Sequence, residues 1–281
     1  MSVLRRPLRT PLVAPHDGIA LHNDMPEKAL VIASTKHENT SWFYDELSEW
    51  RKYVYVVDEP TADLTVTRNK GRESMVYLSF IIDNYRKLPA NILFLHAQRY
   101  QWHNDDPDYD GLSILRQFRI PYLREKGYLN LRCVWVLGCP TEIRPLKDAG
   151  DLVQTQAHAG HFYKQAFEEL FPVAQFQKRL ILEQPVEYYE GIRNWLLKTP
   201  LDDSISGRIV EYSWHMIFGQ EPVHRPDASE CYCKMLGMCN LQCNSNGACE
   251  GRYALPPFAT LPEGWPTIGW HGEFRTPGVP G

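Results

Sequence analysis

Short apolar runs alternate with helix-like segments along the first hundred residues. Residues 29–34, 52–58 and 91–97 are apolar, β-branched or aromatic, and such runs predict buried strands. Between them, residues 40–49 offer a helix cap, and residues 73–85 repeat apolar positions at helical spacing. Strands that alternate with helices are typical of a parallel sheet with helices on its faces. The first hundred residues therefore predict an α/β fold.

The pattern becomes mostly helical downstream and then dissolves. A fourth strand is expected at 133–138 and a short one at 173–177. Helices are expected at 112–118, 155–171, 186–198 and 209–219, the last of which ends at Gly219. Beyond Pro222 the chain is rich in cysteine, proline and tryptophan without a sustained period. We therefore expect an N-terminal arm (1–27), an α/β catalytic domain (28–222) and a C-terminal extension packed on that domain (223–281).

Composition and charge narrow the class of protein. Hydrophobic residues make up 43% and charged residues 23% of the 281, both ordinary for a globular protein. The formal net charge is −4, so bulk charge does not predict a polyanionic partner. We find no window near the roughly 20 apolar residues that span a membrane, and no signal peptide. These features predict a cytoplasmic protein with no membrane partner.

The chain has seven cysteines, five of which crowd one segment near the C-terminus. Their spacing does not match the paired pattern of zinc ribbons, although four could close a structural zinc site. In a reducing compartment such a cluster favours thiols or a metal site over disulfides, whereas a secreted protein would use the same density of cysteines for disulfides. A structural role is expected because the cluster holds no histidine base. The five are Cys231, Cys233, Cys239, Cys243 and Cys249.

The densest candidate site is the segment FLHAQRYQWHNDDPDYD, which follows the third predicted strand. Open α/β sheets place their ligands at such strand ends. His96, Asp105 and Asp106 could bind a divalent cation, Mg²⁺, Mn²⁺ or Zn²⁺, and His103 could act as an acid or base. Alternatively, the carboxylates cap the next helix and the histidines are hydrogen-bonded in the packing.

A second candidate is the pair Glu211 and His215, four residues apart on a predicted helix. Side chains at this spacing share one helix face. A carboxylate beside an imidazole orients it and raises its basicity. The pair could therefore supply a general base. The alternative is an ordinary helical pair facing solvent.

A third candidate is the turn Asn69-Lys70-Gly71-Arg72-Glu73, which leads into a predicted helix. A glycine turn at a helix N-terminus can seat an anion, and Lys70 and Arg72 would add positive charge. A single glycine is weak evidence, however. The favoured interpretation is a plain helix start in which the helix dipole stabilises Glu73.

Several long blocks resemble a fungal family of unknown function. They include ALVIASTKHENTSW, NKGRESMVYLSFIIDNY, LRCVWVLGCP and SGRIVEYSWHMIFG, and the resemblance runs from about residue 29 to 270. The strand layout also resembles A-type glycosyltransferases. That likeness implies a Rossmann-like or glycosyltransferase-A-like, mainly parallel sheet with helices on both faces. The expected Asp-x-Asp metal motif is missing, since His96-Ala97-Gln98 stands in its place.

The same blocks are similar to fungal arginine-containing cyclodipeptide synthases. That resemblance implies secondary-metabolite chemistry, with arginyl-tRNA and a second aminoacyl-tRNA as partners. It implies that Asp105 and Asp106 seat arginine or a metal, and that His103 or His215 is the base, with Glu211 orienting His215. The expected substrate-binding residues are His96, Arg99, Asp110, Asn69, Lys70, Arg72 and Glu73. Rival hypotheses are a metal-dependent glycosyltransferase and a non-catalytic partner of a biosynthetic cluster.

Overall fold

The computed structural model describes residues 2–5, 27–136, 158–171, 181–221 and 224–278. Its centre is a five-stranded sheet in the order β3-β2-β4-β1-β5. β2 (Lys28–Ser34) pairs in parallel with both β3 (Arg51–Val56) and β4 (Asn91–His96). β1 (Ser2–Arg5) lies between β4 and β5 (Tyr128–Asn130) and is antiparallel to both.

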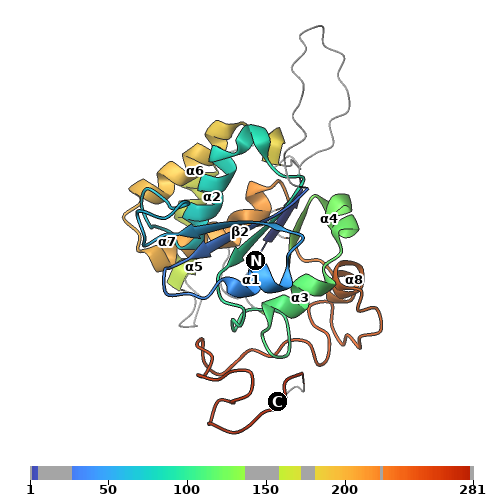
Figure 1. The fold of residues 1–281 in the computed structure, drawn as a ribbon. Coiled ribbons are helices and arrows are strands. Elements are labelled where there is room, and N and C mark those ends of the chain that lie inside the picture. Colours follow the sequence, from blue (N-terminus) through green and yellow to red (C-terminus); the bar gives the residue numbers. More distant parts are fainter. Residues whose placement is uncertain (1, 6–26, 137–157, 172–180, 222–223, 279–281) are drawn as a thin grey trace.

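Helices cover both faces of the sheet (Figure 1). α2 (Glu73–Asp83), α5 (His158–Leu170), α6 (Val186–Lys198) and α7 (Asp203–Ile217) share one hydrophobic core with the strands. α1 (Ser41–Glu46), α3 (Gly111–Gln117), α4 (Ile120–Lys126) and α8 (Ala228–Cys231) contribute to a second core. Shorter turns are η1 (Tyr85–Lys87), η3 (Ile181–Glu183) and the π-helical η4 (Tyr232–Leu236).

The two cores explain the continuous apolar runs of the central strands. In β4, Phe94 belongs to the core of α2 and α7, whereas Leu93 and Leu95 belong to the core of α1 and α3. Successive side chains of a strand point to opposite faces, so a strand covered on both faces is apolar throughout. His96 therefore points to the same face as Phe94, toward the layer of α2 and α7.

The connections place a topological switch point beside His96. The chain leaves β2 toward β3 and returns through α2 to β4, on the other side of β2. It leaves β4 in the opposite direction, toward β5. Neighbouring strands whose connections diverge leave a crevice at their carboxyl ends, where open α/β sheets bind ligands. Here the strands are β2 and β4, where Ala33 pairs with His96.

The predictions from the sequence are correct for the parallel strands and wrong for the antiparallel edge of the sheet. β2, β3 and β4 lie within a residue or two of their expected positions, and α/β architecture is confirmed. The expected strand at 133–138 is wrong for residues 133–136, and a three-residue strand at Tyr128–Asn130 occurs instead. Residues 1–27 were expected to form an arm outside the α/β domain, but Ser2–Arg5 is a strand inside the sheet. The strand expected at 173–177 lies outside the described residues.

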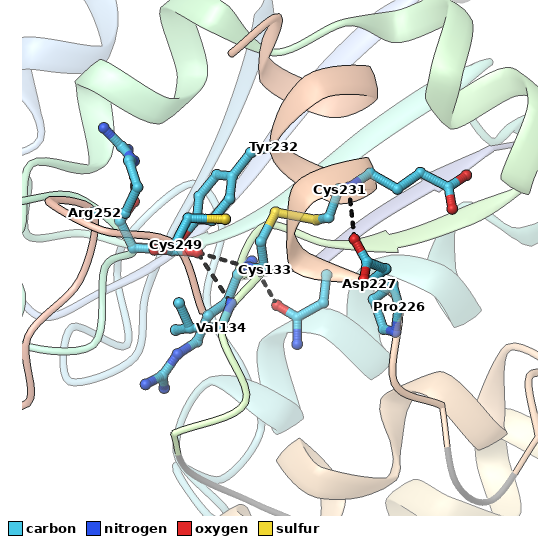
Figure 2. Close-up of a disulfide and its surroundings, with 12 residues drawn as sticks. Cys133, Val134, Pro226, Asp227, Cys231, Tyr232, Cys249 and Arg252 are labelled. Atoms are coloured by element: carbon cyan, nitrogen blue, oxygen red, sulfur yellow. Dashed lines mark hydrogen bonds between the residues drawn. A yellow bond between two sulfur atoms is a disulfide. The ribbon is translucent and has the colours of Figure 1, made fainter. Parts of the chain in front are cut away.

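Disulfides tie the C-terminal extension together and to the sheet domain. Cys133 bonds to Cys231, so the segment after β5 is linked to α8 (Figure 2). Two short loops are closed by Cys233–Cys239 and Cys243–Cys249. The expectation of thiols or a metal site is therefore corrected, and the structural role of the cluster stands. The three disulfides between described residues are typical of proteins from oxidising compartments. The cytoplasmic location therefore stays a prediction.

No helix in the described ranges is long and apolar enough to cross a bilayer.

Candidate functional site

The loop after β4 is held as a compact structure by its own backbone and by Asn104. Gln101 and Gly111 donate backbone N–H groups across the loop to Tyr109 and Arg99. The side-chain amide of Asn104, which is buried, donates to the same two carbonyls, of Arg99 and Tyr109, at 3.0 and 2.9 Å. The loop is therefore folded into the protein instead of projecting into solvent.

Asp105 is a buried structural carboxylate. Its Oδ2 accepts the backbone N–H of Cys133 at 2.7 Å and that of Val134 at 3.3 Å, and its Oδ1 accepts the hydroxyl of Tyr232. Burial raises the pKa of Asp105, while these hydrogen bonds act in the opposite direction. The carboxylate thus joins the β4 loop to Cys133, one half of the Cys133–Cys231 disulfide.

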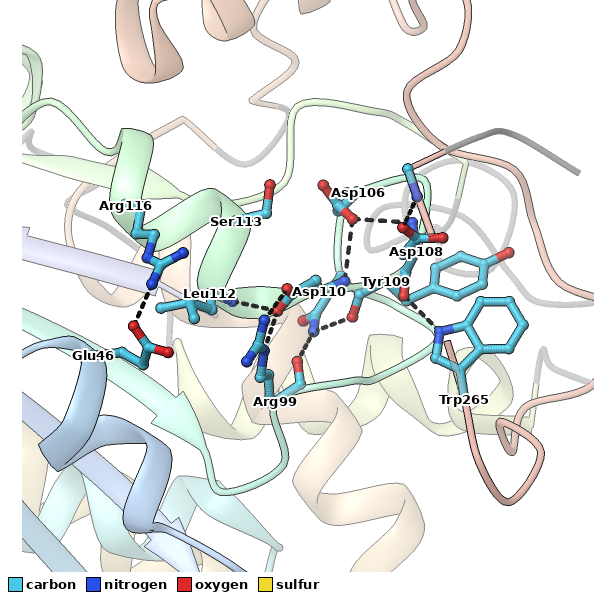
Figure 3. A network of polar contacts seen from close by, with 12 residues as sticks. Glu46, Arg99, Asp106, Asp108, Tyr109, Asp110, Leu112, Ser113, Arg116 and Trp265 are labelled. Carbon is cyan, nitrogen blue, oxygen red and sulfur yellow. Dashed lines mark hydrogen bonds and ion pairs between the residues drawn. The ribbon is translucent and has the colours of Figure 1, made fainter. Parts of the chain in front are cut away.

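Arginines of the chain itself pair with two further carboxylates of the loop, and Figure 3 shows the first of these pairs, Arg99 with Asp110. Arg99 donates two hydrogen bonds to the carboxylate of Asp110, at 2.9 and 2.7 Å. Asp110 also caps α3, because its side chain accepts the backbone N–H of Leu112. Asp108 pairs with Arg275 at 3.2 Å.

Asp106 completes this network. Its Oδ1 accepts the backbone N–H groups of Asp108 and Asp110, at 3.0 and 3.3 Å. Its other oxygen lies 3.8 Å from the guanidinium of Arg252, which comes from the C-terminal extension. The structural alternative therefore describes this loop well, because its four carboxylates are engaged within the fold. In the part of the chain that is described, no three His, Cys, Asp or Glu side chains group as metal ligands.

The two histidines of this region differ from the carboxylates. His96 is 9% exposed, and neither of its ring nitrogens makes a hydrogen bond of normal geometry within the described residues, although the side chain of Asn104 and the backbone of Gln98 lie near enough to act on its pKa. Its ring packs edge to face with His103, the centroids 4.9 Å apart. Burial lowers the pKa of His96 to about 3 and holds the pKa of His103 well below its ordinary value. Both imidazoles are therefore neutral at pH 7.

A carboxylate pair lies on the helices that face His96. Glu73 begins α2 and is partly buried, and Glu211 lies exposed on α7. Withdrawal from water raises the pKa of Glu73, and the charge of Glu211 adds to that shift. Tyr77, one turn after Glu73, is buried and interacts electrostatically with both carboxylates. Sequence reasoning missed Tyr77, although its spacing from Glu73 places both on one helix face.

Close packing explains why α7 meets the start of α2. A Cβ at Gly207 would lie 2.9 Å from the carbonyl oxygen of Gly71, so only glycine permits this contact. Glu211, one turn after Gly207 on the same face, is thereby brought toward α2, and Arg208 lies next to Gly207 along the helix. Arg208 acts electrostatically on His103, and Glu211 acts on Glu73. Helix α7 thus reaches the histidine pair and the carboxylate pair.

The histidines and the carboxylates lie at the same level of the sheet. The rings of Tyr77 and Phe94 are 4.8 Å apart. Helix α2 connects two parallel strands and runs in the opposite direction to them. Its first residue, Glu73, and the last residue of β4, His96, therefore both lie at the carboxyl edge of the sheet. We define the carboxyl-edge cluster as His96, His103, Glu73, Tyr77 and Glu211.

The turn at 69–73 is engaged within the fold. Lys70 is buried and donates to the carbonyls of Thr199 and Leu201, at 3.1 and 2.8 Å. The N–H of Gly71 points to the carboxylate of Asp203 at 3.4 Å. Lys70 is therefore not presented to a phosphate, which agrees with the interpretation as a helix start. Asn69 and Arg72 are exposed.

Glu211 and His215 lie on one face of α7, as expected, but Glu211 interacts with α2 instead of with His215. No hydrogen bond joins their side chains within the described ranges, whereas Glu211 acts on α2. His215 lies one turn farther along the helix, away from the end that meets Gly71. The geometry therefore favours His103 over His215 as a base.

Comparison with known proteins identifies a family whose description gives no activity. A model for a family described as protein of unknown function, DUF3431, matches residues 30–234. No curated protein matches, and no solved structure matches. The matched segment includes the parallel strands, the β4 loop, α7 and the Cys133–Cys231 disulfide, and therefore every member of the carboxyl-edge cluster. Because the match covers more than half of the 281 residues, the chain belongs to the DUF3431 family.

Proposed function

We propose that the chain is an enzyme whose active site is the carboxyl-edge cluster. The observation that carries this proposal is the pair of neutral imidazoles, buried His96 and half-buried His103, at a switch point of the sheet. Burying the ring nitrogens of His96 without well-formed hydrogen bonds costs stability, which favours a functional role for this residue. A neutral imidazole is also the form that accepts a proton.

For the reaction, we propose that this enzyme is an arginine-containing cyclodipeptide synthase of fungal secondary metabolism. In each condensation the α-amine of one aminoacyl group attacks the ester carbonyl of another. The new C–N bond replaces the C–O bond to the tRNA ribose, and the proton leaves the amine for His103 and ends on the ribose oxygen. Two such steps close a diketopiperazine ring. Its partners are arginyl-tRNA and a second aminoacyl-tRNA, and no step needs a metal ion.

The structure changes the roles first assigned to the aspartates. Asp105 and Asp106 accept hydrogen bonds from backbone N–H groups and lie against Arg252, so in this proposal they shape the loop that carries His103. Glu73 and Glu211 are the carboxylates left for the substrate. A metal-dependent glycosyltransferase has less support, because it would need Asp105 and Asp106 as metal ligands.

The test is expression of the full chain in a heterologous host, followed by mass spectrometry of the extract. The proposal predicts cyclo-Arg-Xaa products that disappear without the chain, and purified protein that forms them from aminoacyl-tRNAs. A folded protein that yields no such product would rule out the synthase. Heat on mixing with a UDP or GDP sugar would instead favour the glycosyltransferase, and inactivity in both assays would leave the non-catalytic partner.

A further inference from the structure

Arg132 is a half-buried cation that lies just after β5, next to Cys133. Its Nε and Nη2 atoms are buried, yet they make no hydrogen bond of normal geometry within the described residues. No ion pair joins Arg132 to a carboxylate in the described ranges, whereas Arg99, Arg252 and Arg275 each lie against an aspartate of the β4 loop. Burying a positive charge and its N–H groups without partners is costly, so this arrangement is typical of a site that a ligand completes.

The unpartnered atoms of Arg132 form the edge of the guanidinium that suits oxyanions. Nε and Nη2 present two parallel N–H groups, which match two oxygens of a carboxylate or a phosphate. Arg99 uses the same edge within this protein, since its Nε and Nη2 donate to the two oxygens of Asp110 at 2.9 and 2.7 Å. The corresponding edge of Arg132 has no such acceptor among the described residues. It therefore suits an anion that offers at least two oxygens.

A chain of contacts connects this guanidinium to His103. The Cζ of Arg132 lies over the ring of Tyr253, 4.7 Å from its centroid. The hydroxyl of Tyr253 donates to the backbone carbonyl of Trp102 at 3.0 Å, and the ring of Trp102 packs edge to face against His103, with centroids 5.5 Å apart. Burial is the main cause of the lowered pKa of His103, and the charge of Arg132 adds to it. Arg132 thus belongs to the surroundings of the histidine pair.

The two nearest candidates for an internal partner of Arg132 are engaged in other contacts. Asp105 is close enough for the charge of Arg132 to oppose the effect of burial on its pKa. Its oxygens, however, already accept two backbone N–H groups and the hydroxyl of Tyr232. The hydroxyl of Tyr253 also lies within the influence of Arg132, but the guanidinium lies over the ring and no hydrogen bond of normal geometry forms. An anion from outside the chain is therefore the partner that fits.

We propose that Arg132 binds a phosphate group of the substrate through its Nε–Nη2 edge, beside His103. This inference rests on the proposed function, which supplies the source of the anion. In an aminoacyl-tRNA the amino acid is an ester and has no free carboxylate, so the phosphodiesters of the last nucleotides are the anions nearest to the reacting carbonyl. Contacts to phosphate position a nucleic acid without reading its bases. Arg132 is thus a positioning residue that holds the acceptor end of the tRNA with its ester near His103.

The experiment titrates three probes into the full-length protein by calorimetry at constant ionic strength. The probes are adenosine monophosphate (AMP), adenosine, which lacks the phosphate, and acetate, which offers a carboxylate instead. Saturable binding of AMP is expected, with adenosine and acetate at least tenfold weaker. Arg132→Gln should weaken AMP binding about tenfold or more, the usual effect of losing charge-assisted hydrogen bonds. Arg132→Lys should bind AMP with intermediate affinity, because lysine keeps the charge and lacks the two-donor edge.

A matched control is Arg116→Gln, which removes an exposed arginine that pairs with Glu46. This variant should bind the probes as the wild type does. A second readout is the pKa of His103, followed by NMR in the wild type with and without AMP. Because the charge of Arg132 contributes to the lowering of this pKa, a phosphate bound to Arg132 should raise it. The wild-type measurement remains decisive if Arg132→Gln does not fold.

Four results would overturn the phosphate site. They are no saturable binding of AMP by folded wild-type protein, binding of adenosine or acetate as tight as that of AMP, unchanged AMP binding by folded Arg132→Gln, and a pKa of His103 that AMP does not raise. The outcome is separable from that of the proposed reaction. Arg132-dependent binding of AMP without diketopiperazine formation would leave the site and remove the synthase, whereas full product formation by Arg132→Gln would remove the site and leave the synthase.

Discussion

The imidazole rings of His96 and His103 meet edge to face, with 4.9 Å between centroids and 86° between planes. One ring comes from the last residue of β4 and the other from the loop that follows it. Depressed pKa values distinguish this pair from the nearby aspartates, which are engaged within the fold, and the ring nitrogens of His96 make no well-formed hydrogen bond within the described residues. The two histidines are therefore the residues of this region that best fit the proposed catalytic role.

Acid should unfold the protein in part through His96. Its pKa is about 3 in the folded protein against an ordinary 6.5, so the unfolded chain binds the proton more tightly. The free energy of unfolding is then unaffected above pH 6.5 and falls as the pH decreases from 6.5 toward 3. At pH 5 the loss is about 2 kcal/mol. Urea unfolding of the wild type and His96→Gln at pH 7 and pH 5 measures this, and equal losses in both proteins would contradict it.

Replacing Glu73 by glutamine should stabilise the protein at neutral pH. Because the pKa of Glu73 is raised in the folded state, its ionised form is less favourable there than in the unfolded chain. The penalty is present above the folded pKa and disappears below the ordinary value of 4.5. Thermal unfolding should show a higher Tm for Glu73→Gln at pH 7, with a smaller gain at pH 4. A lower Tm at pH 7 would show that the carboxylate is paired.

Asp105→Asn should be strongly destabilising. The substitution replaces one acceptor oxygen by an NH₂ group that must face Tyr232 or the N–H groups of Cys133 and Val134. Loss of a buried, multiply bonded carboxylate costs about 3 kcal/mol. Glu46→Gln is the control, because its ion pair with Arg116 is exposed and contributes less than about 1 kcal/mol. Equal urea midpoints for the two variants would refute a structural role of Asp105.

The Cys133–Cys231 disulfide should contribute more stability than the two short ones. It closes a loop of 98 residues, whereas Cys233–Cys239 closes one of 6. Loop-closure entropy then predicts losses of about 5 and about 2 kcal/mol when each pair is replaced by serine. Denaturant unfolding of the two double variants tests the order, and a larger loss for the short loop would reverse it.

The redox state of the isolated protein also bears on the proposed substrate. Disulfides persist in oxidising compartments, whereas aminoacyl-tRNA is a donor of the reducing cytosol. The structure predicts an intact mass lower by two hydrogens for each disulfide when the protein is analysed without reductant. Finding the oxidised protein confined to a secretory compartment of its own cells would contradict the tRNA-dependent reaction and leave the carboxyl-edge cluster to a different donor.

The periodicity of the sequence was informative where burial imposes it. β2 and β4 are covered on both faces, so their apolar runs mark their positions closely. β5 has only three residues, too few to show a pattern, and β1 pairs with β4 across almost ninety positions of sequence. Local patterns carry no signal for such pairing, and for that reason the antiparallel edge was misplaced.

The sequence pointed to the loop after β4 because ligands of open α/β sheets lie past strand ends, and it named His96 and His103 there. The switch point itself follows from the spatial order of the strands, which the sequence does not contain. Aspartates look alike in a sequence whether they bind a ligand or an internal arginine. Asp108 and Asp106 meet Arg275 and Arg252, which are more than 140 positions away, so their use could not be foreseen. The contact of Gly207 with Gly71, which brings α7 to the site, is equally non-local.

Diketopiperazine formation by a His103→Gln variant tests the central claim most directly. The variant and the Glu46→Gln control would be expressed beside the wild type, and cyclo-Arg-Xaa would be measured by mass spectrometry against the amount of folded protein. Loss of a general base predicts a fall of about 100-fold or more for His103→Gln and no change for Glu46→Gln. Undiminished product from folded His103→Gln would contradict the assignment of the histidine pair as the reactive centre.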